Sequence, residues 1–189
     1  MFQNCYSLRF LKIPKLYVDN AKYALSMFEN CYSLKSLDLN SFTFASAISM
    51  DKMFRNCYSL TSINLPNFDT FNAVLMGSLF ENCSSLTSLD LSHFDTSNVV
   101  DISYMFYNCT SLKNLKINFN TKKVKNMEFS FGFCNSLTSL DISTFDTFNC
   151  INFNNIFEND LNLNVYLDIN KCKNLIQYIP DYIIIHDIS

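Results

Sequence analysis

The chain is poor in the residues that most often mark turns, phosphate loops and catalytic centres. Its 189 residues include two Gly, three Pro, two His and no Trp. A Gly-rich phosphate-binding loop needs closely spaced glycines, and Gly77 and Gly132 are far apart, so we exclude such a loop. The histidines, His93 and His186, are isolated and give little support to Ser-His-Asp or Cys-His catalysis. We therefore expect no enzyme activity and no cofactor.

Long apolar runs and strong charge are also missing. No stretch of about 18 apolar residues occurs, so we expect no transmembrane helix and no insertion into a membrane. The first residues, MFQNCYSL, lack the basic and apolar regions of a signal peptide. We expect either a cytoplasmic protein or a fragment of a larger exported one. The formal net charge of −3 gives no electrostatic case for nucleic-acid binding.

What the chain does contain is an internal repeat. Six of its cysteines recur at one constant interval, which is a single residue shorter only at the last step, and each has a Phe three residues before it and a Leu three residues after it. Asp160 continues the column at the full interval. Such self-similarity is the signature of a stack of coils, each burying its apolar face against the next. The column is Cys5, Cys31, Cys57, Cys83, Cys109 and Cys134.

The pattern within one unit predicts three parts. Apolar residues at intervals of three and four from Val99 onward predict a short helix around 101–109. Leu115 and Ile117 alternate with polar residues, which predicts a short strand with one buried face. The segment after the strand is, in its best form, a Phe-Asp-Thr corner, at 68–70, 94–96 and 145–147. We expect its Phe to enter the core and its polar pair to bond turn backbone. A second short strand is possible around 98–100.

These parts predict an α/β repeat solenoid, with short parallel β-strands on one face and short helices on the other. Residues 1–158 are six tandem 25–26-residue repeats, and 159–189 form a degenerate terminal repeat or C-terminal cap with a last strand at 182–185. The fifth unit is one residue short between Ile117 and Phe119, which predicts a local kink or bulge.

The cysteine column is expected to be structural. Zinc sites need ligands at close spacings such as C-x2-C, and no Cys here has another within four residues. Vertical disulfides need Cα atoms about 4.4–6.8 Å apart, whereas packed helices would hold the coils about 8–10 Å apart. We predict eight free, mostly buried thiols and no metal site. The Asn column that begins at Asn4 is expected to form a ladder of side-chain bonds to backbone between coils.

Two exposed rows are the candidate binding residues. Solenoids present the outward positions of their strands as an extended binding face, although a merely solvated sheet explains such a row equally well. These positions are Lys12, Asp38, Asn64, Asp90, Lys116 and Asp141. A second, aromatic row at the next turn could bury much area at low entropic cost, or simply cover the core. It consists of Tyr6, Tyr32 and Tyr58.

The units NCSSLTSLDLSHFDTSNVV and MFYNCTSLKNLKI resemble the BspA-like leucine-rich repeat surface proteins, in their 26-residue subclass. The resemblance covers about 1–158 and implies a leucine-rich-repeat-like fold. It also implies a location on the cell surface or outside the cell and a role in adhesion or host interaction, through a protein, glycan or matrix-protein ligand. The alternative is an intracellular leucine-rich-repeat scaffold that binds a cellular protein.

Overall fold

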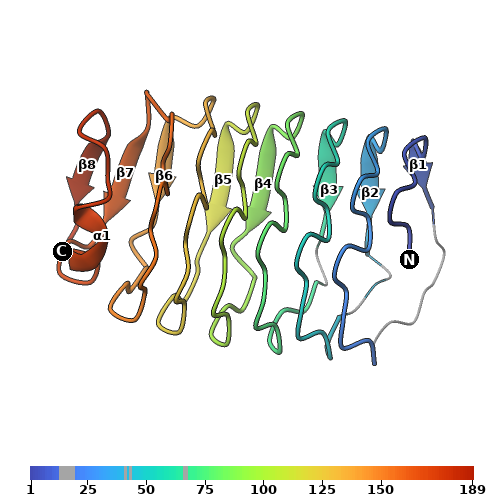
Figure 1. Cartoon of the computed structure of the whole chain (residues 1–189), viewed down its shortest axis with the longest axis horizontal. Helices are drawn as coiled ribbons and strands as arrows, with labels where there is room; N and C mark the ends of the chain where they lie inside the picture. The colour runs from blue at the N-terminus through green and yellow to red at the C-terminus, as the bar shows by residue number, and fades with distance from the viewer. Residues whose placement is uncertain (13–19, 41, 43, 66–67) are drawn as a thin grey trace.

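The computed structural model shows a single stack of coils with the strands in one row along it (Figure 1). It describes residues 1–12, 20–40, 42, 44–65 and 68–189. Each coil contributes one strand of two to four residues to the row, and the N- and C-termini lie at opposite ends of the stack. The strands are β1 (Phe10–Leu11), β2 (Ser36–Asp38), β3 (Ser62–Asn64), β4 (Ser88–Leu91), β5 (Asn114–Ile117), β6 (Ser139–Asp141), β7 (Asn164–Leu167) and β8 (Ile184–Asp187).

All strand pairings in the row are parallel, and the register follows the repeat. Leu37 pairs with Ile63, and Leu89 pairs with Leu115, so equivalent core residues lie side by side. The ladder has the orders β1-β2-β3, β4-β5 and β6-β7-β8. The ladder of backbone hydrogen bonds is thus interrupted twice. The interruption between β5 and β6 adjoins the shortened fifth unit, where the sequence predicts a kink. The repeat spacing does not predict the interruption between β3 and β4.

The face opposite the strands was predicted to carry short helices, and this prediction was wrong. Residues 103–108, at the centre of the expected helix, are a succession of turns. Among the described residues only α1 (Lys173–Ile176) is an α-helix. A series of single-residue parallel bridges, one between each pair of successive coils, runs along this side from Tyr23 to Asn152. It passes through Asp101, beside the second strand expected at 98–100.

Backbone hydrogen bonds explain why these segments cannot be helices. The N–H groups of Tyr104, Phe106 and Asn108 donate to carbonyls of the next coil, at 2.8–2.9 Å. The alternate residues Met105 and Tyr107 donate to carbonyls three residues back. Tyr104 and Asn108 have φ of 57° and 59°, a left-handed conformation that interrupts a right-handed helix. The intervals of three and four therefore reflect turn-by-turn burial on a coil and not a helical stripe.

The core is built from columns of identical side chains. The Phe rings three residues before each cysteine stack on one another from Phe2 to Phe157, with centroids 5.2–6.1 Å apart. Such offset aromatic pairs stabilise beyond their buried area by about 0.5–1.5 kcal/mol each. The Leu and Cys columns pack beside them, so each coil is stabilised chiefly by its two neighbours.

The Phe-Asp-Thr corners take the predicted roles. Phe145 is buried, and the carboxylate of Asp146 accepts a bond from the backbone N–H of Phe148 two residues on. Thr147 reaches further than predicted, because its hydroxyl donates to the Lys171 carbonyl of the next coil at 3.2 Å. The corners thus join neighbouring coils as well as turning the chain.

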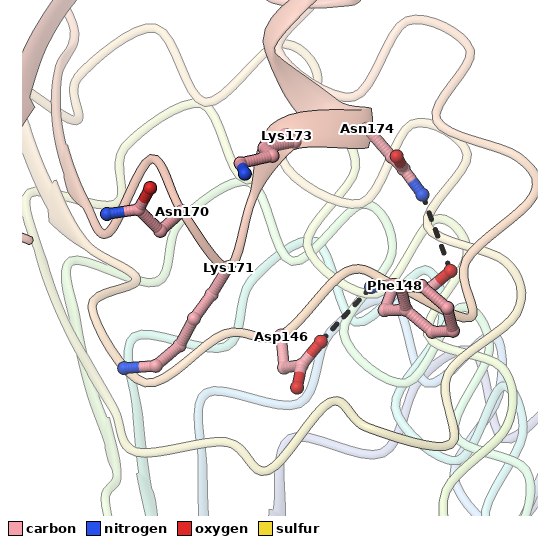
Figure 2. Close-up of a pocket in the computed structure, with 6 residues that line it drawn as sticks. All are labelled: Asp146, Phe148, Asn170, Lys171, Lys173 and Asn174. Atoms are coloured by element: carbon pink, nitrogen blue, oxygen red, sulfur yellow. Dashed lines mark hydrogen bonds between the residues drawn. The ribbon is translucent and has the colours of Figure 1, made fainter.

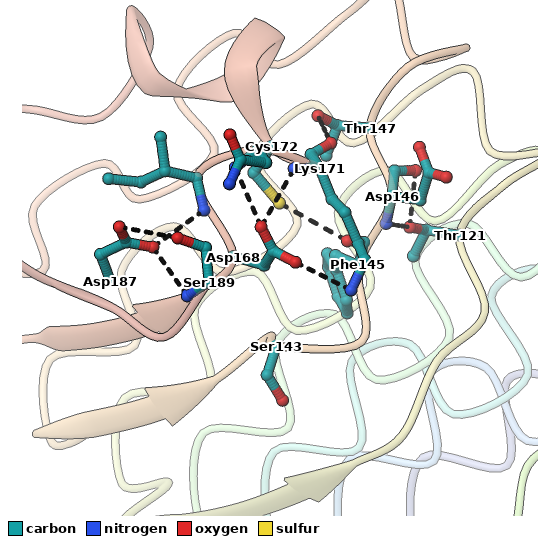
Figure 3. A network of polar contacts seen from close by, with 12 residues as sticks. Thr121, Ser143, Phe145, Asp146, Thr147, Asp168, Lys171, Cys172, Asp187 and Ser189 are labelled. Atoms are coloured by element: carbon teal, nitrogen blue, oxygen red, sulfur yellow. Dashed lines mark hydrogen bonds and ion pairs between the residues drawn. The ribbon is translucent and has the colours of Figure 1, made fainter.

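The C-terminal segment continues the same sheet. β7 pairs with β6 and β8 with β7, and β8 begins two residues after the strand expected at 182–185. A polar network links the last coils (Figure 3), in which Asp168 pairs with Lys171 at 2.8 Å. Asp187 accepts bonds from the backbone N–H groups of Ile169 and Ser189. Residues 159–189 therefore end the stack with paired strands.

Candidate functional site

The predicted strand row is on the surface. All six of its residues are exposed, because side chains on a strand alternate between core and solvent. The register places Asp38 beside Asn64, and Asp90 beside Lys116. Lys116 Nζ lies 3.7 Å from Asp90 Oδ2, an exposed ion pair. The remaining members are Lys12, which follows β1, and Asp141, which lies beside Tyr166.

The aspartates of this row lie at the last or next-to-last residue of their strands. Asp38, Asp90 and Asp141 each accept a hydrogen bond at Oδ1 from the backbone N–H two residues on, at 2.9–3.1 Å. The Ser92 hydroxyl donates to Asp90 Oδ1 as well, at 2.6 Å. These bonds from Ser92 hold the pKa of Asp90 below its usual value. Asp90 therefore carries a negative charge at neutral pH.

A groove of about 410 Å³ opens in the row where the ladder parts between β3 and β4. His93 lines the groove, with Nε2 2.8 Å from the Leu65 carbonyl oxygen and its ring edge-on to Phe94. Two predicted binding residues, Asn64 and Asp90, line the groove. Its other lining residues are Ile63, Leu65, Ser88, Leu89, Ser92 and His93.

The row extends beyond the residues that the sequence singled out. Tyr166 pairs in register with His186 of β8, and their rings stack with centroids 4.4 Å apart. His186 Nε2 lies 3.0 Å from Asn164 Oδ1. The repeat has decayed at this end, so no column pointed to these residues. Only the sheet brings them into line with Asp141.

The tyrosine row is exposed and continuous. Tyr6, Tyr32 and Tyr58 have 51%, 39% and 41% of their surface accessible. Their rings lie 4.9 and 5.2 Å apart in tilted pairs, so they form one aromatic strip at the N-terminal end of the stack. The strip is a separate surface from the strand row, since each tyrosine precedes its strand across a turn.

The cysteine column offers no reactive centre. All eight cysteines are free, as predicted, and all but Cys5 are buried. The argument against disulfides from the distance between packed helices was wrong, because the cysteines lie on turns and not on helices. Cys57 Sγ instead donates to the carbonyl of Phe28 in the preceding coil at 3.3 Å. Cys31, Cys83 and Cys109 make the equivalent bond. Burial raises the pKa of Cys31 to about 11 and of Cys109 to about 12, so these thiols stay protonated.

The structure holds few other options for chemistry. In the described ranges no cluster of three or more His, Cys, Asp and Glu side chains is placed to bind a metal ion. No helix in the described part of the chain is long and apolar enough to cross a membrane. What the site can do is present fixed charges, a polar groove and aromatic rings to a partner.

These features define a parallel-strand solenoid whose coils repeat at the interval of the cysteine column. The chain matches the family described as "Mycoplasma protein of unknown function, DUF285" in three overlapping segments, 1–88, 24–139 and 75–178. Since these segments together span 1–178, the chain belongs to this family. No curated protein and no solved structure gives a significant match.

Proposed function

We propose that the protein is a non-catalytic interaction module of the BspA-like leucine-rich repeat class, which binds a protein or glycan at a cell surface. The observation that carries the proposal is the polar groove at the strand row, where Asn64 and Asp90 meet beside the ion pair with Lys116. Solenoids use such repeated strand faces as extended binding surfaces. The repeated unit with its Phe-Asp-Thr corner supports the placement in this class.

A non-catalytic role fits the two histidines. His93 contacts a backbone carbonyl and His186 an amide oxygen, in different coils. Neither is hydrogen-bonded to a serine or cysteine nucleophile in the way that an activated nucleophile requires. Activity screens that gave the same result for the protein and for a His93→Ala/His186→Ala variant would support this interpretation.

Binding at the groove is tested with immobilised glycans and purified extracellular-matrix proteins. We expect Asn64→Ala/Asp90→Ala/Lys116→Ala to reduce binding at least tenfold, since removing contacts at the centre of an interface costs more than about 1 kcal/mol each. The control is Lys22→Ala/Asp181→Ala, which changes exposed charges away from the row. Equal losses in both variants, or binding in neither the protein nor the control, would reject this surface.

The alternative is an intracellular scaffold that uses the same face. The eight free cysteines favour a reducing compartment. However, burial protects seven of them from oxidants, so the column also suits an oxidising one. Protease treatment of intact cells separates the two: loss of the protein from intact cells supports the surface role, and protection until lysis supports the scaffold.

A further inference from the structure

The two most exposed large apolar side chains among the described residues belong to one corner of the stack. Phe148 and Ile151 are 80% and 81% exposed and lie only three residues apart. The corner is held rigidly: the Phe148 N–H donates to Asp146, and the Ile151 N–H donates to the Lys125 carbonyl at 3.0 Å. Neither residue belongs to the strand row or the tyrosine strip.

Lysines flank this corner on both neighbouring coils. Asn149 of the corner bonds the Lys122 carbonyl, and Asn174, beside Lys173, bonds the Phe148 carbonyl (Figure 2). The two sides are hollowed. A hollow of about 360 Å³ is lined by Val100, Lys122, Lys123, Lys125 and Asn149. A hollow of about 410 Å³ is lined by Asp146, Phe148, Asn170, Lys171, Lys173 and Asn174.

The charge at this corner is positive although the chain as a whole is negative. Lys171 is paired with Asp168, and Lys123 donates to the neutral amide of Asn98. Within the described residues Lys122, Lys125 and Lys173 form no ion pair. Asp146 is the carboxylate that faces the hollow, and one of its oxygens is engaged by the Phe148 N–H. We call Lys122, Lys123, Lys125, Phe148, Ile151 and Lys173 the basic corner.

We propose that the basic corner docks on the surface of a bilayer that contains anionic phospholipid. Phe148 and Ile151 would enter the boundary between headgroups and acyl chains, and the lysines would contact the lipid phosphates. Interfacial anchoring needs this combination of apolar area and cationic charge. Each lysine near an anionic surface strengthens binding about fivefold.

A protein partner fits this corner less well. Lysine is depleted at protein–protein interfaces, where the strongest contacts are apolar side chains in desolvated pockets. Here the apolar pair is flanked by lysines of the neighbouring coils, whose strongly hydrated ammonium groups suit a phosphate-rich surface. Such docking is peripheral, so it differs from the membrane-spanning insertion that the sequence argues against. It would orient the stack while leaving the strand row free.

The absence of tryptophan gives a direct test. A Phe148→Trp variant carries a single tryptophan, in the basic corner, whose emission can be excited apart from that of the tyrosines. We expect its emission to shift to the blue with vesicles of phosphatidylcholine and phosphatidylglycerol, and to stay unchanged with phosphatidylcholine alone. The matched control is Phe71→Trp, in the same column three coils earlier, where 57% of the residue is exposed. The neighbouring corners at 45–48 and 97–100 contain no lysine of their own, and Lys123 contacts them through its bond to Asn98. The emission of this variant should respond much less than that of Phe148→Trp.

Charge is tested by co-sedimentation with the same vesicles. Lys122→Gln/Lys123→Gln/Lys125→Gln should weaken binding roughly a hundredfold. The exposed control triple Lys35→Gln/Lys52→Gln/Lys113→Gln removes the same charge elsewhere and should have little effect. Binding should disappear at about 1 M salt, where the Debye length is about 3 Å. The proposal is overturned if Phe148→Trp is silent with anionic vesicles, or if both triples lose binding equally. It is also overturned if the blue shift appears without lipid and grows with protein concentration, which would identify a second copy as the occupant.

Discussion

Asn56 Nδ2 donates to Asn30 Oδ1 at 2.7 Å, and both residues have positive φ, 61° and 63°. The same bond repeats along the stack at 2.7–2.8 Å: Asn108 donates to Asn82, Asn82 to Asn56, and Asn30 to Asn4. The ladder therefore joins side chain to side chain, which corrects the predicted bonds to backbone. Asparagine tolerates the left-handed region, so it replaces the glycine that the chain lacks, and neither Gly77 nor Gly132 has positive φ.

Breaking this ladder should be costly. We expect Asn82→Ala to lower the free energy of unfolding by about 2–4 kcal/mol, because alanine is strained at positive φ and the amides of Asn56 and Asn108 lose a partner. Asn82→Gly, which relieves only the strain, should cost about 1–2 kcal/mol. Urea titration measures both. The exposed control Asn118→Ala should stay within about 0.5 kcal/mol of the parent. If Asn82→Ala behaves like this control, the ladder contributes nothing.

Asp160 should make the protein less stable as the pH rises. It occupies the cysteine column with only 1% of its surface exposed, and its carboxylate approaches the Cys134 N–H without forming a hydrogen bond. Burial raises its pKa from 3.8 to about 8. Between these values the unfolded chain has lost the proton that the folded chain keeps, so stability falls with pH and levels off above the folded pKa.

We therefore expect Asp160→Asn to raise stability at pH 8, by an amount on the order of 5 kcal/mol at most, and to flatten the pH profile. Thermal unfolding from pH 5 to 9 measures this. Asp187→Asn alters an exposed carboxylate whose pKa is already lowered, so it should retain the parental slope over this range. A profile for Asp160→Asn that parallels the parent would show that Asp160 is not the titrating group.

The buried thiols should be free but unreactive in the native protein. In the native protein at neutral pH we expect an aromatic disulfide reagent to react first with Cys5, the one cysteine that is not fully buried. The buried thiols should react only as the chain unfolds, because burial raises their pKa, to about 11 for Cys150 and Cys172. Denaturation without a reductant should expose all eight. Fewer than eight would reveal a disulfide and contradict the column of free thiols.

Arg55 should behave as a link between three coils. Its guanidinium lies 3.6 Å from Glu29 Oε1 and 3.0 Å from Glu81 Oε2, and both glutamates are buried. We expect Arg55→Met to cost about 1–3 kcal/mol in urea titration, since two buried carboxylates lose their cationic partner while the arginine itself is partly exposed. Glu29 keeps its hydrogen bond from Gln3. Arg55→Met/Glu29→Gln/Glu81→Gln should recover part of this loss. A triple variant less stable than Arg55→Met would show that the charges do not act together.

The repeat made much of the fold predictable. The constant interval between equivalent side chains gives the coil length, and alternation at Leu89 and Leu91 gives a strand with one buried face. Equal coil lengths then impose an in-register parallel sheet. The same alternation placed Asp38, Asn64 and Asp90 on the outer surface. Binding at these positions remains a prediction.

Other features depend on contacts that a pattern does not record. The helix expected at 101–109 failed because burial at intervals of three and four arises both on a helix and on tight turns. The groove lined by His93 depends on the interruption of the ladder between β3 and β4, and the repeat spacing of these two units gives no sign of it. The basic corner joins Lys122 and Phe148, which the repeat places in one column, with Lys173 of the decayed last coil, which only the stack brings beside them.

The sequence by itself determined that the chain stacks coils, which side chains form the Phe, Leu and Cys columns, and which face of each strand is exposed. These follow from periodicity, because equal repeats place like residues at like positions. Only the tertiary structure decided what the backbone between those positions does. Each N–H in a turn can bond within its own coil or to the next coil, and the neighbouring coil supplies the carbonyl that settles the choice. The turns that replace the expected helices and the asparagine ladder follow from that choice.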